Sequence, residues 1–308
     1  MRALVAPGQG AQKPGMLGPW LDLEGARERL ERWSELARVD LIAAGTTASA
    51  DQIRDTAVAQ PLLTAAALLS FEAVDQPFDL VAGHSVGEFG AAVIAGVLTA
   101  DDAISAVGAR GRAMAECAAA QPSAMAAVVG GAPDAVLQAV QRAGAWPANF
   151  NGPGQIVAGG SEAALARLAE LAPERARLVR LDVAGAFHTP LMGQAEHALR
   201  AALAGAPVET ARLPLVTNRA GVAMTNGHQI VESLIQQVTR PVRWDLVLEA
   251  FAARQVTAHL ELAPAGVLTG LAKRGLKEAA REKVSPGAPP NQTEENPDER
   301  TARGSGQE

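Results

Sequence analysis

One pentapeptide combines a nucleophilic side chain with glycines where a sharp turn needs them. The segment Gly83-His84-Ser85-Val86-Gly87 matches the G-x-S-x-G nucleophile elbow, in which a serine sits between a strand and a helix. An apolar run at 78–82 and small residues at 88–95 predict that strand and that helix. Ser85 would then be a nucleophile, with the Val86 amide beside the developing oxyanion. A glycine-rich turn without chemistry is the alternative.

A serine hydroxyl needs a base, usually a histidine, within hydrogen-bond distance. Among the five histidines, His188 lies in Gly185-Ala186-Phe187-His188-Thr189-Pro190, after a predicted strand, where the sites of α/β proteins form. His84 adjoins the serine but would point elsewhere if Ser85 occupies the tip of the turn. We expect His188 to be the base, with a buried structural histidine as an equal alternative.

Arg110 is expected to face inward on a helix that starts after Thr99 and runs to about residue 119. It shares the helical spacing of the apolar residues Ala103, Val107 and Met114. A buried arginine needs a partner, and an ion pair with an acidic residue is the structural interpretation that we favour from spacing alone. The candidate partners are Glu72, Glu88 and Glu116. The functional interpretation is a guanidinium that grips a substrate carboxylate through two parallel hydrogen bonds.

The glycines of Gly8-Gln9-Gly10 do not form a phosphate loop. A G-x-G-x-x-G pattern would need glycine where Lys13 stands, and no G-K-[ST] follows, so no nucleotide cofactor is expected. As the first loop after a strand, the segment could supply a second oxyanion N–H, or it could be a plain tight turn.

Cys117 is the single cysteine, which forbids an intrachain disulfide and a multi-cysteine metal site and favours a reducing, cytoplasmic compartment.

Composition excludes several classes of protein. The chain has 308 residues, a net charge of −6 and 48% hydrophobic residues, which suit a folded core and not a nucleic-acid binder. The longest apolar stretch, 62–71, is too short for a membrane span of about 20 residues. The N-terminus reaches Pro7 and Gly8 too early for a signal peptide. We therefore expect no membrane role.

The elements that must position these side chains follow an α/β pattern. Strands are expected at 3–6, 78–82, 212–217 and 256–262, and helices at 56–71, 191–203 and 227–238, which predicts a doubly wound parallel sheet. Residues 123–185 read as βαββαβ, with strands at 124–129 and 178–183, the order of a ferredoxin-like insert. The large domain would comprise 1–122 and 186–282. Residues 283–308 are polar and proline-rich and are expected to be a disordered tail.

Taken together, these motifs resemble the malonyl-CoA:acyl carrier protein transacylase family. The resemblance covers residues 3–275 and rests on the order of several motifs: Gly8-Gln9-Gly10-Ala11-Gln12, Ala59-Gln60-Pro61, Gly83-His84-Ser85-Val86-Gly87-Glu88, Arg110-Gly111, Gly185-Ala186-Phe187-His188, and Gln237 ahead of Pro241-Val242-Arg243-Trp244. The resemblance implies a hydrolase-like α/β domain with a ferredoxin-like insert, in agreement with the element pattern.

The resemblance also assigns roles to individual residues. It implies that Ser85 is the nucleophile, that His188 is its base, and that Arg110 anchors the malonyl carboxylate. The amides of Gln9 and Val86 would form the oxyanion hole. Three further implied roles are the orientation of the histidine by the backbone carbonyl of Gln237, the lining of the acyl pocket by Gln60, and the crowding of an α-methyl branch by Phe187. A plain core phenylalanine is the alternative for the last.

The implied reaction is a ping-pong transfer of malonyl from malonyl-CoA, through Ser85, to the phosphopantetheine thiol of an acyl carrier protein, for fatty acid or polyketide synthesis. It requires neither a metal nor a cofactor. Carrier proteins are typically acidic, so a local basic patch is expected to dock them, with Arg240, Arg243, Lys273 and Arg274 as candidates. The alternatives are a serine esterase or thioesterase and a non-catalytic carrier-binding protein. Arg110, the missing acid and the intact Ser and His argue against them.

Overall fold

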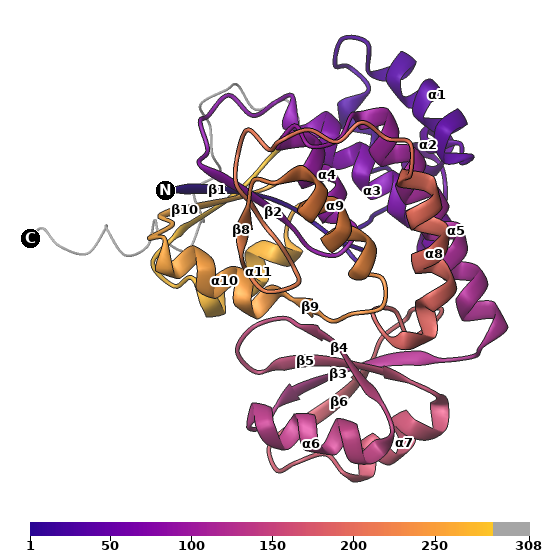
Figure 1. Ribbon diagram of the computed structural model, residues 1–308, viewed down its shortest axis with the longest axis vertical. Helices are drawn as coiled ribbons and strands as arrows, with labels where there is room; N and C mark the ends of the chain where they lie inside the picture. The colour runs from indigo at the N-terminus through magenta and orange to yellow at the C-terminus, as the bar shows by residue number, and fades with distance from the viewer. Residues whose placement is uncertain (286–308) are drawn as a thin grey trace, which may run out of the picture.

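The computed structural model describes residues 1–285 as a mixed α/β protein with two sheets (Figure 1). The first sheet has the strand order β11-β10-β1-β2-β7-β8. Its strands are parallel except for β8, which pairs with β7 in the antiparallel direction. Their bounds are β1 Arg2–Ala6, β2 Leu80–Gly83, β7 Leu215–Val216, β8 Ala223–Met224, β10 Ala258–Glu261 and β11 Ala280–Lys283.

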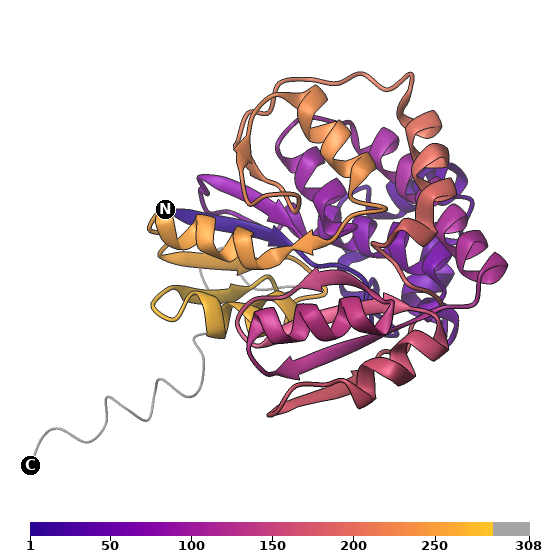
Figure 2. The ribbon, with the colours of Figure 1, turned by 60° about the horizontal axis from the view of Figure 1, so that its bottom comes forward.

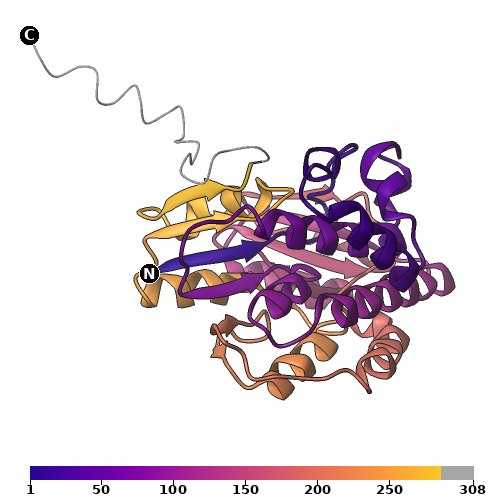
Figure 3. The ribbon, with the colours of Figure 1, turned by 90° about the horizontal axis from the view of Figure 1, so that it is seen from above.

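Both faces of this sheet are covered by helices and therefore buried. Because successive side chains of a strand point to opposite faces, one strand contributes to the core on each side. Leu4 and Ala6 of β1 join the larger core cluster, whereas Ala3 and Val5 join a second cluster on the other side. The larger core includes α1 Ala26–Ala37, α2 Leu41–Thr46, α3 Thr56–Phe71, α4 Gly87–Ile94, α5 Ala100–Ala120, α8 Gly193–Leu203 and α9 Gly227–Gln236. The second cluster is closed by α10 Trp244–Ala253 and α11 Val267–Gly275. Figure 3 shows this sheet from above, with β1 and β2 running side by side.

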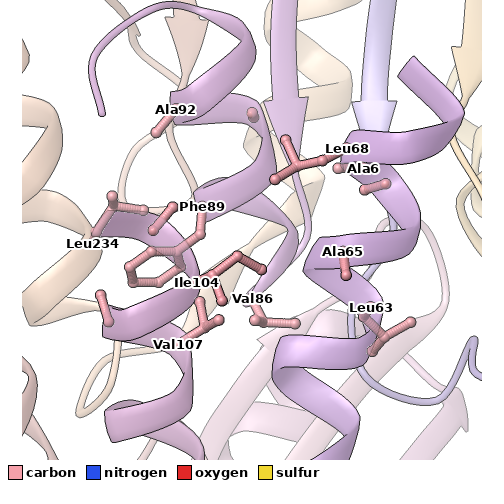
Figure 4. Close-up of a cluster of buried hydrophobic side chains, with 14 of the residues drawn as sticks. Ala6, Leu63, Ala65, Leu68, Val86, Phe89, Ala92, Ile104, Val107 and Leu234 are labelled. Carbon is pink, nitrogen blue, oxygen red and sulfur yellow. The ribbon is translucent and has the colours of Figure 1, made fainter. Parts of the chain in front are cut away.

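The larger core is built from small and aliphatic side chains, as the shortage of aromatic residues requires. Figure 4 shows one of its few aromatic side chains, Phe89 of α4, packed among Ile104 and Val107 of α5 and Leu234 of α9. Phe89 is fully buried. This packing fixes α4, the helix that follows the G-x-S-x-G segment, against the rest of the core.

The second sheet has the order β6-β3-β5-β4-β9. Its bounds are β3 Ala124–Gly130, β4 Trp146–Phe150, β5 Gln155–Gly160, β6 Ala176–Arg180 and β9 Val242–Arg243, with the helices α6 Pro133–Ala143 and α7 Glu162–Glu170. Ala126 and Val128 of β3 pack with α6 and α7, which Figures 1 and 2 show on the outer face of this sheet. Met125 and Ala127 point the other way and join the larger core. The two sheets therefore share one apolar core.

Several boundaries differ from the sequence-based expectation. The strand expected at 212–217 is only Leu215–Val216; Pro214 has no N–H to donate to a ladder. The strand expected at 178–183 is Ala176–Arg180; the Leu181 N–H still donates to the Met125 carbonyl of β3 at 3.0 Å, and Leu181 and Val183 line a cavity. Short 3₁₀ helices at Gly18–Trp20, Gln52–Arg54 and Pro190–Met192 were not expected.

The strands β9 and β11 were also not expected. Lys283, assigned to the structureless tail, ends β11, and the next amide, Val284 N–H, donates to the Glu261 carbonyl at 2.9 Å. The rest of the expected tail, 286–308, lies outside the described residues. Among residues 1–285, no helix combines the length and the apolar character needed to cross a bilayer.

Candidate active site

The G-x-S-x-G segment forms a sharp turn between β2 and α4, and Ser85 stands at its tip with a left-handed backbone (φ 53°). Both glycines are required by close backbone approach. A Cβ on Gly83 would lie 2.1 Å from the carbonyl carbon of Gly87, and a Cβ on Gly87 would lie 2.2 Å from the Ala6 oxygen. Real side chains do not tolerate such distances, so α4 can start this close to β1 only with glycine at both positions. The strained serine is thereby presented to the cavity.

Ser85 and His188 form a buried hydrogen-bonded pair. The Oγ atom of Ser85 lies 2.7 Å from the Nε2 atom of His188, and the Nδ1 atom of His188 lies 2.8 Å from the Gln237 carbonyl oxygen. Because a carbonyl can only accept, Nδ1 carries the proton and Nε2 is free to take the proton of Ser85. Burial, followed by the charge of Arg110, lowers the pKa of His188 to about 3, so its ring is neutral at physiological pH.

Arg110 faces inward as its helical spacing predicts, but the expected ion pair is wrong. Its Nη1 donates to Gln60 Oε1 at 2.5 Å, and its Nη2 donates to Gln237 Oε1 at 3.0 Å and to Ser85 Oγ at 3.3 Å. Glu72 pairs with Arg29 instead, at 2.9 Å. Neutral amides accept from the guanidinium, so its charge is hydrogen-bonded but not neutralised.

The charge of Arg110 persists despite its burial. Burial lowers the pKa of Arg110 to about 10, and the nearby charge of Glu88 opposes this. The guanidinium is therefore still cationic at neutral pH. Its Nε atom is buried without a hydrogen-bond partner among the described residues. An uncompensated buried cation beside a serine nucleophile is suited to an anionic substrate.

The two candidate oxyanion amides line the same cavity of about 270 Å³ as Ser85, His188 and Arg110. In the described part of the chain, neither the Gln9 N–H nor the Val86 N–H donates to a protein acceptor. The side chain of Gln9 donates a hydrogen bond from its Nε2 to Thr56 Oγ1 at 3.0 Å. Both amides are thus free to donate to a substrate oxygen.

The remaining predicted pocket residues lie in this cavity as well. Gln60 and Phe187 line it together with Met114 and Met125, and the exposed fraction of Phe187 is 6%. His84 points away from the serine: its Nε2 lies 3.0 Å from Asn151 Oδ1, and its ring packs on Trp244. Cys117 is a buried free thiol of the core.

The basic residues proposed to dock a carrier fall on two neighbouring surfaces. Arg240 and Arg243 line one pocket and Arg274 another, and Phe150 lines both. Arg243 lies over the Phe150 ring, 4.5 Å from its centre, and pairs with Asp245 at 2.7 Å. Lys273 precedes Arg274 in the last turn of α11. No group of three or more potential metal ligands occurs among residues 1–285.

Two further residues, Asn218 and Glu88, take part in this site in ways that the sequence patterns did not predict. Asn218, which follows β7, accepts from the Ser85 N–H at 2.8 Å and donates to the Gly83 carbonyl at 2.7 Å. Glu88 accepts from the Asn218 N–H at 2.8 Å and from the Gln237 side chain. A polar residue at the end of a parallel strand was the available signal for Asn218. Glu88 stood in the recognised motif but was considered only as an ion-pair partner of Arg110.

Comparison with known proteins places this site in a family. A family model described as "Acyl transferase domain" matches residues 3–305. The malonyl CoA-acyl carrier protein transacylase of Mycobacterium tuberculosis strain H37Rv is 46% identical over 90% of this chain and 94% of its own. The crystal structure of the Mycobacterium tuberculosis MCAT superposes with a TM-score of 0.89 at 45% identity, covering 92% of this chain and 96% of that chain.

A second solved structure shows such an enzyme with a partner. It is a type II PKS acyl-carrier protein in complex with its malonyl-transacylase, with a TM-score of 0.85 and 31% identity over 92% of this chain and 95% of that chain. Each of these matches spans nearly the whole of both chains. The chain therefore belongs to the acyl transferase family and, within it, to the malonyl CoA-acyl carrier protein transacylases.

Proposed function

We propose that this chain transfers a malonyl group from malonyl-CoA to the phosphopantetheine thiol of an acyl carrier protein, for fatty acid or polyketide synthesis. The observation that carries this proposal is the environment of the Arg110 side chain. Arg110 is 1% exposed, and its guanidinium lies within hydrogen-bond distance of Ser85 Oγ. It forms no direct ion pair with a carboxylate among the described residues. A malonyl thioester is the acyl group that supplies the missing carboxylate next to its reacting carbonyl.

In the first half-reaction, Ser85 Oγ attacks the thioester carbonyl while His188 Nε2 takes the hydroxyl proton. The amides of Gln9 and Val86 donate to the tetrahedral oxyanion. The carbon–sulfur bond then breaks, and the sulfur of coenzyme A leaves with the proton from His188. The product is malonyl-Ser85, and the Gln237 carbonyl holds the imidazolium that forms on the way.

In the second half-reaction, the carrier thiol gives its proton to His188 and attacks the malonyl ester. The carbon–oxygen bond to Ser85 breaks, and His188 returns the proton to the serine. The proposed steps need neither a metal nor a cofactor, because every proton and electron pair is supplied by substrate and by this chain. Arg110 would pair with the malonyl carboxylate through both half-reactions, and Gln60 and Phe187 would shape the pocket around it.

We further propose the finer architecture and the setting of this reaction. Residues 1–122 and 186–282 would form a hydrolase-like doubly wound catalytic domain, and 123–185 a ferredoxin-like insert; the strand order β6-β3-β5-β4 supports the latter. The single, free Cys117 supports a reducing compartment such as the cytoplasm.

The carrier protein would dock on Arg240, Arg243, Lys273 and Arg274. These residues supply positive charge in a chain whose net charge is −6, and carrier proteins are typically acidic. Reversal to glutamate at Arg240 and Lys273, singly, should raise the KM for the carrier and leave the KM for malonyl-CoA unchanged. An unchanged carrier KM would remove this docking site.

The transferase is tested by the intact mass of the protein after brief exposure to malonyl-CoA and then to a phosphopantetheinylated carrier. A malonyl adduct that maps to Ser85, persists in water and moves to the carrier establishes the transfer. Ser85→Ala should form no adduct. An adduct lost to water without the carrier would instead identify a thioesterase, and no adduct in the unaltered protein would favour a non-catalytic carrier-binding protein.

A further inference from the structure

A buried hydrogen-bond network lies directly behind the reacting groups, and the proposed steps do not use it. Glu88 and Asn218 are fully buried, and Gln237 is 4% exposed. They come from three separate places in the chain: the first turn of α4, the second residue after β7, and the residue that follows α9. Together they contact Ser85, Arg110 and His188.

The side chain of Gln237 can adopt only one amide orientation in these surroundings. Its Nε2 faces three acceptors, namely Glu88 Oε2, Ser85 O at 3.2 Å and Asn218 Oδ1 at 3.3 Å. Its Oε1 accepts from Arg110 Nη2 at 3.0 Å. The flipped amide would place an oxygen against three acceptors and an NH₂ group against a guanidinium. Of the three acceptors, Glu88 is the only ionisable side chain, and the hydrogen bonds from Gln237 and Asn218 favour its charged form against the burial that raises its pKa to about 8.

The second oxygen of Glu88 acts on the nucleophile turn. Glu88 Oε1 accepts the backbone N–H of Asn218 at 2.8 Å, and the Asn218 side chain in turn bridges the Ser85 N–H and the Gly83 carbonyl. A left-handed serine is a strained conformation that persists only when its surroundings hold it. Asn218 supplies that restraint, and Glu88 fixes Asn218.

We propose that Glu88 is a positioning residue of the malonyl-transfer site, which aligns Arg110 through the side chain of Gln237 and the Ser85 turn through Asn218. Glu88 touches neither the acyl group nor the reacting atoms. Gln237 thus acts twice: its backbone carbonyl orients His188, while its side chain transmits the position of Glu88 to Arg110. This inference rests on the proposed function, because the alignment of Arg110 matters only for a substrate with a carboxylate.

The charge relation between Glu88 and Arg110 supports this arrangement. Burial raises the pKa of Glu88 to about 8, an effect that the charge of Arg110 opposes, and the charge of Glu88 in turn raises the pKa of Arg110 against the larger effect of burial. The carboxylate nevertheless reaches Arg110 through Gln237 and not directly, so both Nη atoms of Arg110 contact neutral oxygens. A direct ion pair would compete with the substrate carboxylate for the same guanidinium.

The test uses Glu88→Met, which keeps the length and helical preference of the side chain but removes both acceptors. We expect the rate of acyl-Ser85 formation from malonyl-CoA to fall about 10- to 100-fold, because the Asn218 N–H and the Gln237 side chain would be left buried without their acceptors. The rate from acetyl-CoA, which has no carboxylate for Arg110, should fall less, so the malonyl-to-acetyl ratio decreases. Rapid-quench intact mass with each thioester gives both rates.

Glu261→Met is the matched control. Glu261 is also fully buried and accepts backbone N–H groups, from Gly266, Leu268 and Thr269 at 2.8–2.9 Å, but it does not reach Gln237. Its loss should lower the melting temperature without changing the malonyl-to-acetyl ratio. A stability effect alone therefore cannot imitate the expected result for Glu88→Met.

The second variant is Gln237→Leu, which keeps the backbone carbonyl that holds His188 and removes the link to Arg110. It should lower the malonyl-to-acetyl ratio as Glu88→Met does, and it keeps the proposal testable if Glu88→Met does not fold. A folded Glu88→Met, or a folded Gln237→Leu, with the ratio of the unaltered protein overturns the positioning role. If the unaltered protein forms no malonyl-Ser85, the proposed function itself has failed, which is a different result.

Discussion

The Nη2 atom of Arg110 lies 3.3 Å from the Oγ atom of Ser85, the proposed nucleophile. A cation at this distance stabilises negative charge that develops on Oγ, and it also opposes protonation of the nearby His188. Arg110 thus has an electrostatic influence on the reacting pair in addition to its proposed contact with the malonyl carboxylate.

Replacement of Arg110 by alanine should weaken malonyl transfer far more than acetyl transfer. The loss for malonyl should be roughly 2–5 kcal/mol in activation free energy, because the substrate carboxylate would be buried without a partner. The ratio of kcat/KM for the two thioesters measures it. Arg112→Ala on the same helix is the control, since Arg112 donates to the Ala37 carbonyl and is absent from the cavity lining. Equal losses for both thioesters would make Arg110 a structural residue.

The pH dependence of acylation should change when Arg110 is lost. Burial first and the charge of Arg110 second lower the pKa of His188 to about 3, so removal of the charge should raise that pKa towards its ordinary value. Because only neutral His188 accepts a proton, the acidic limb of the rate profile should move to higher pH in Arg110→Met. Single-turnover acylation by acetyl-CoA measures this without the malonyl contact. If the acidic limb of the rate profile lay at the same pH in Arg110→Met and in the unaltered protein, the charge of Arg110 would not influence the pKa of His188.

Phe187 should restrict substituents at the carbon between the two malonyl carbonyls. It lines the cavity with an exposed fraction of 6%, next to His188 in sequence, so it occupies space that an α-methyl branch would need. Phe187→Ser should raise the methylmalonyl-to-malonyl ratio of transfer, whereas Phe187→Leu, which retains bulk, should raise it less. Competition between the two thioesters followed by mass spectrometry of the carrier gives the ratio. An unchanged ratio in the serine variant would refute the idea.

His259 on β10 should make the fold sensitive to acid. It is fully buried, both ring nitrogens lack a partner among the described residues, and burial lowers its pKa to about 4. The unfolded chain binds a proton near pH 6.5 and the folded chain only near pH 4, so stability is complete above pH 6.5 and falls as the pH drops towards 4. The loss should reach about 3 kcal/mol.

His259→Phe should reduce this acid-dependent loss by the share of His259, because the ring that must be protonated on unfolding is gone. His84 and His188 keep their own shares, since burial lowers their pKa values as well. Urea unfolding at several pH values measures it, and His197→Gln, at an exposed position of α8, is the control. If the loss of stability between pH 6.5 and pH 4 were as large in His259→Phe as in the unaltered protein, His259 would not contribute to it.

Local chemistry made the nucleophile turn predictable. The two glycines of the motif, the apolar run before it and the small residues after it all lie within residues 78–95, and the structure places Ser85 at the tip accordingly. Helical periodicity likewise placed Arg110 inside. The period of a helix says which face a residue occupies but not which element it meets, so the expected carboxylate partner was wrong.

The missed features depend on contacts between distant segments. Asn218 meets Ser85 across 133 positions, and Gln237 meets Glu88 across 149. The local signal of each residue is weak, since single amides are common at the ends of helices and strands. The short strands β9 and β11 were missed for the same reason: two to four residues carry almost no periodicity, and only their neighbours make them strands.

The strand β9 belongs by sequence to the part of the chain that carries His188, yet it pairs in parallel with β4, Asn149 opposite Val242 and Phe150 opposite Arg243. It therefore connects the two sides of the active-site cleft, namely the second sheet and the part of the chain that carries His188. A hinge that opened the cleft widely would have to break main-chain hydrogen bonds at this point, and the His84–Asn151 bond as well. The cleft should consequently keep a constant width during turnover. We expect the flexible phosphopantetheine chain of a thioester substrate to enter the existing cavity and reach Ser85 without a domain movement.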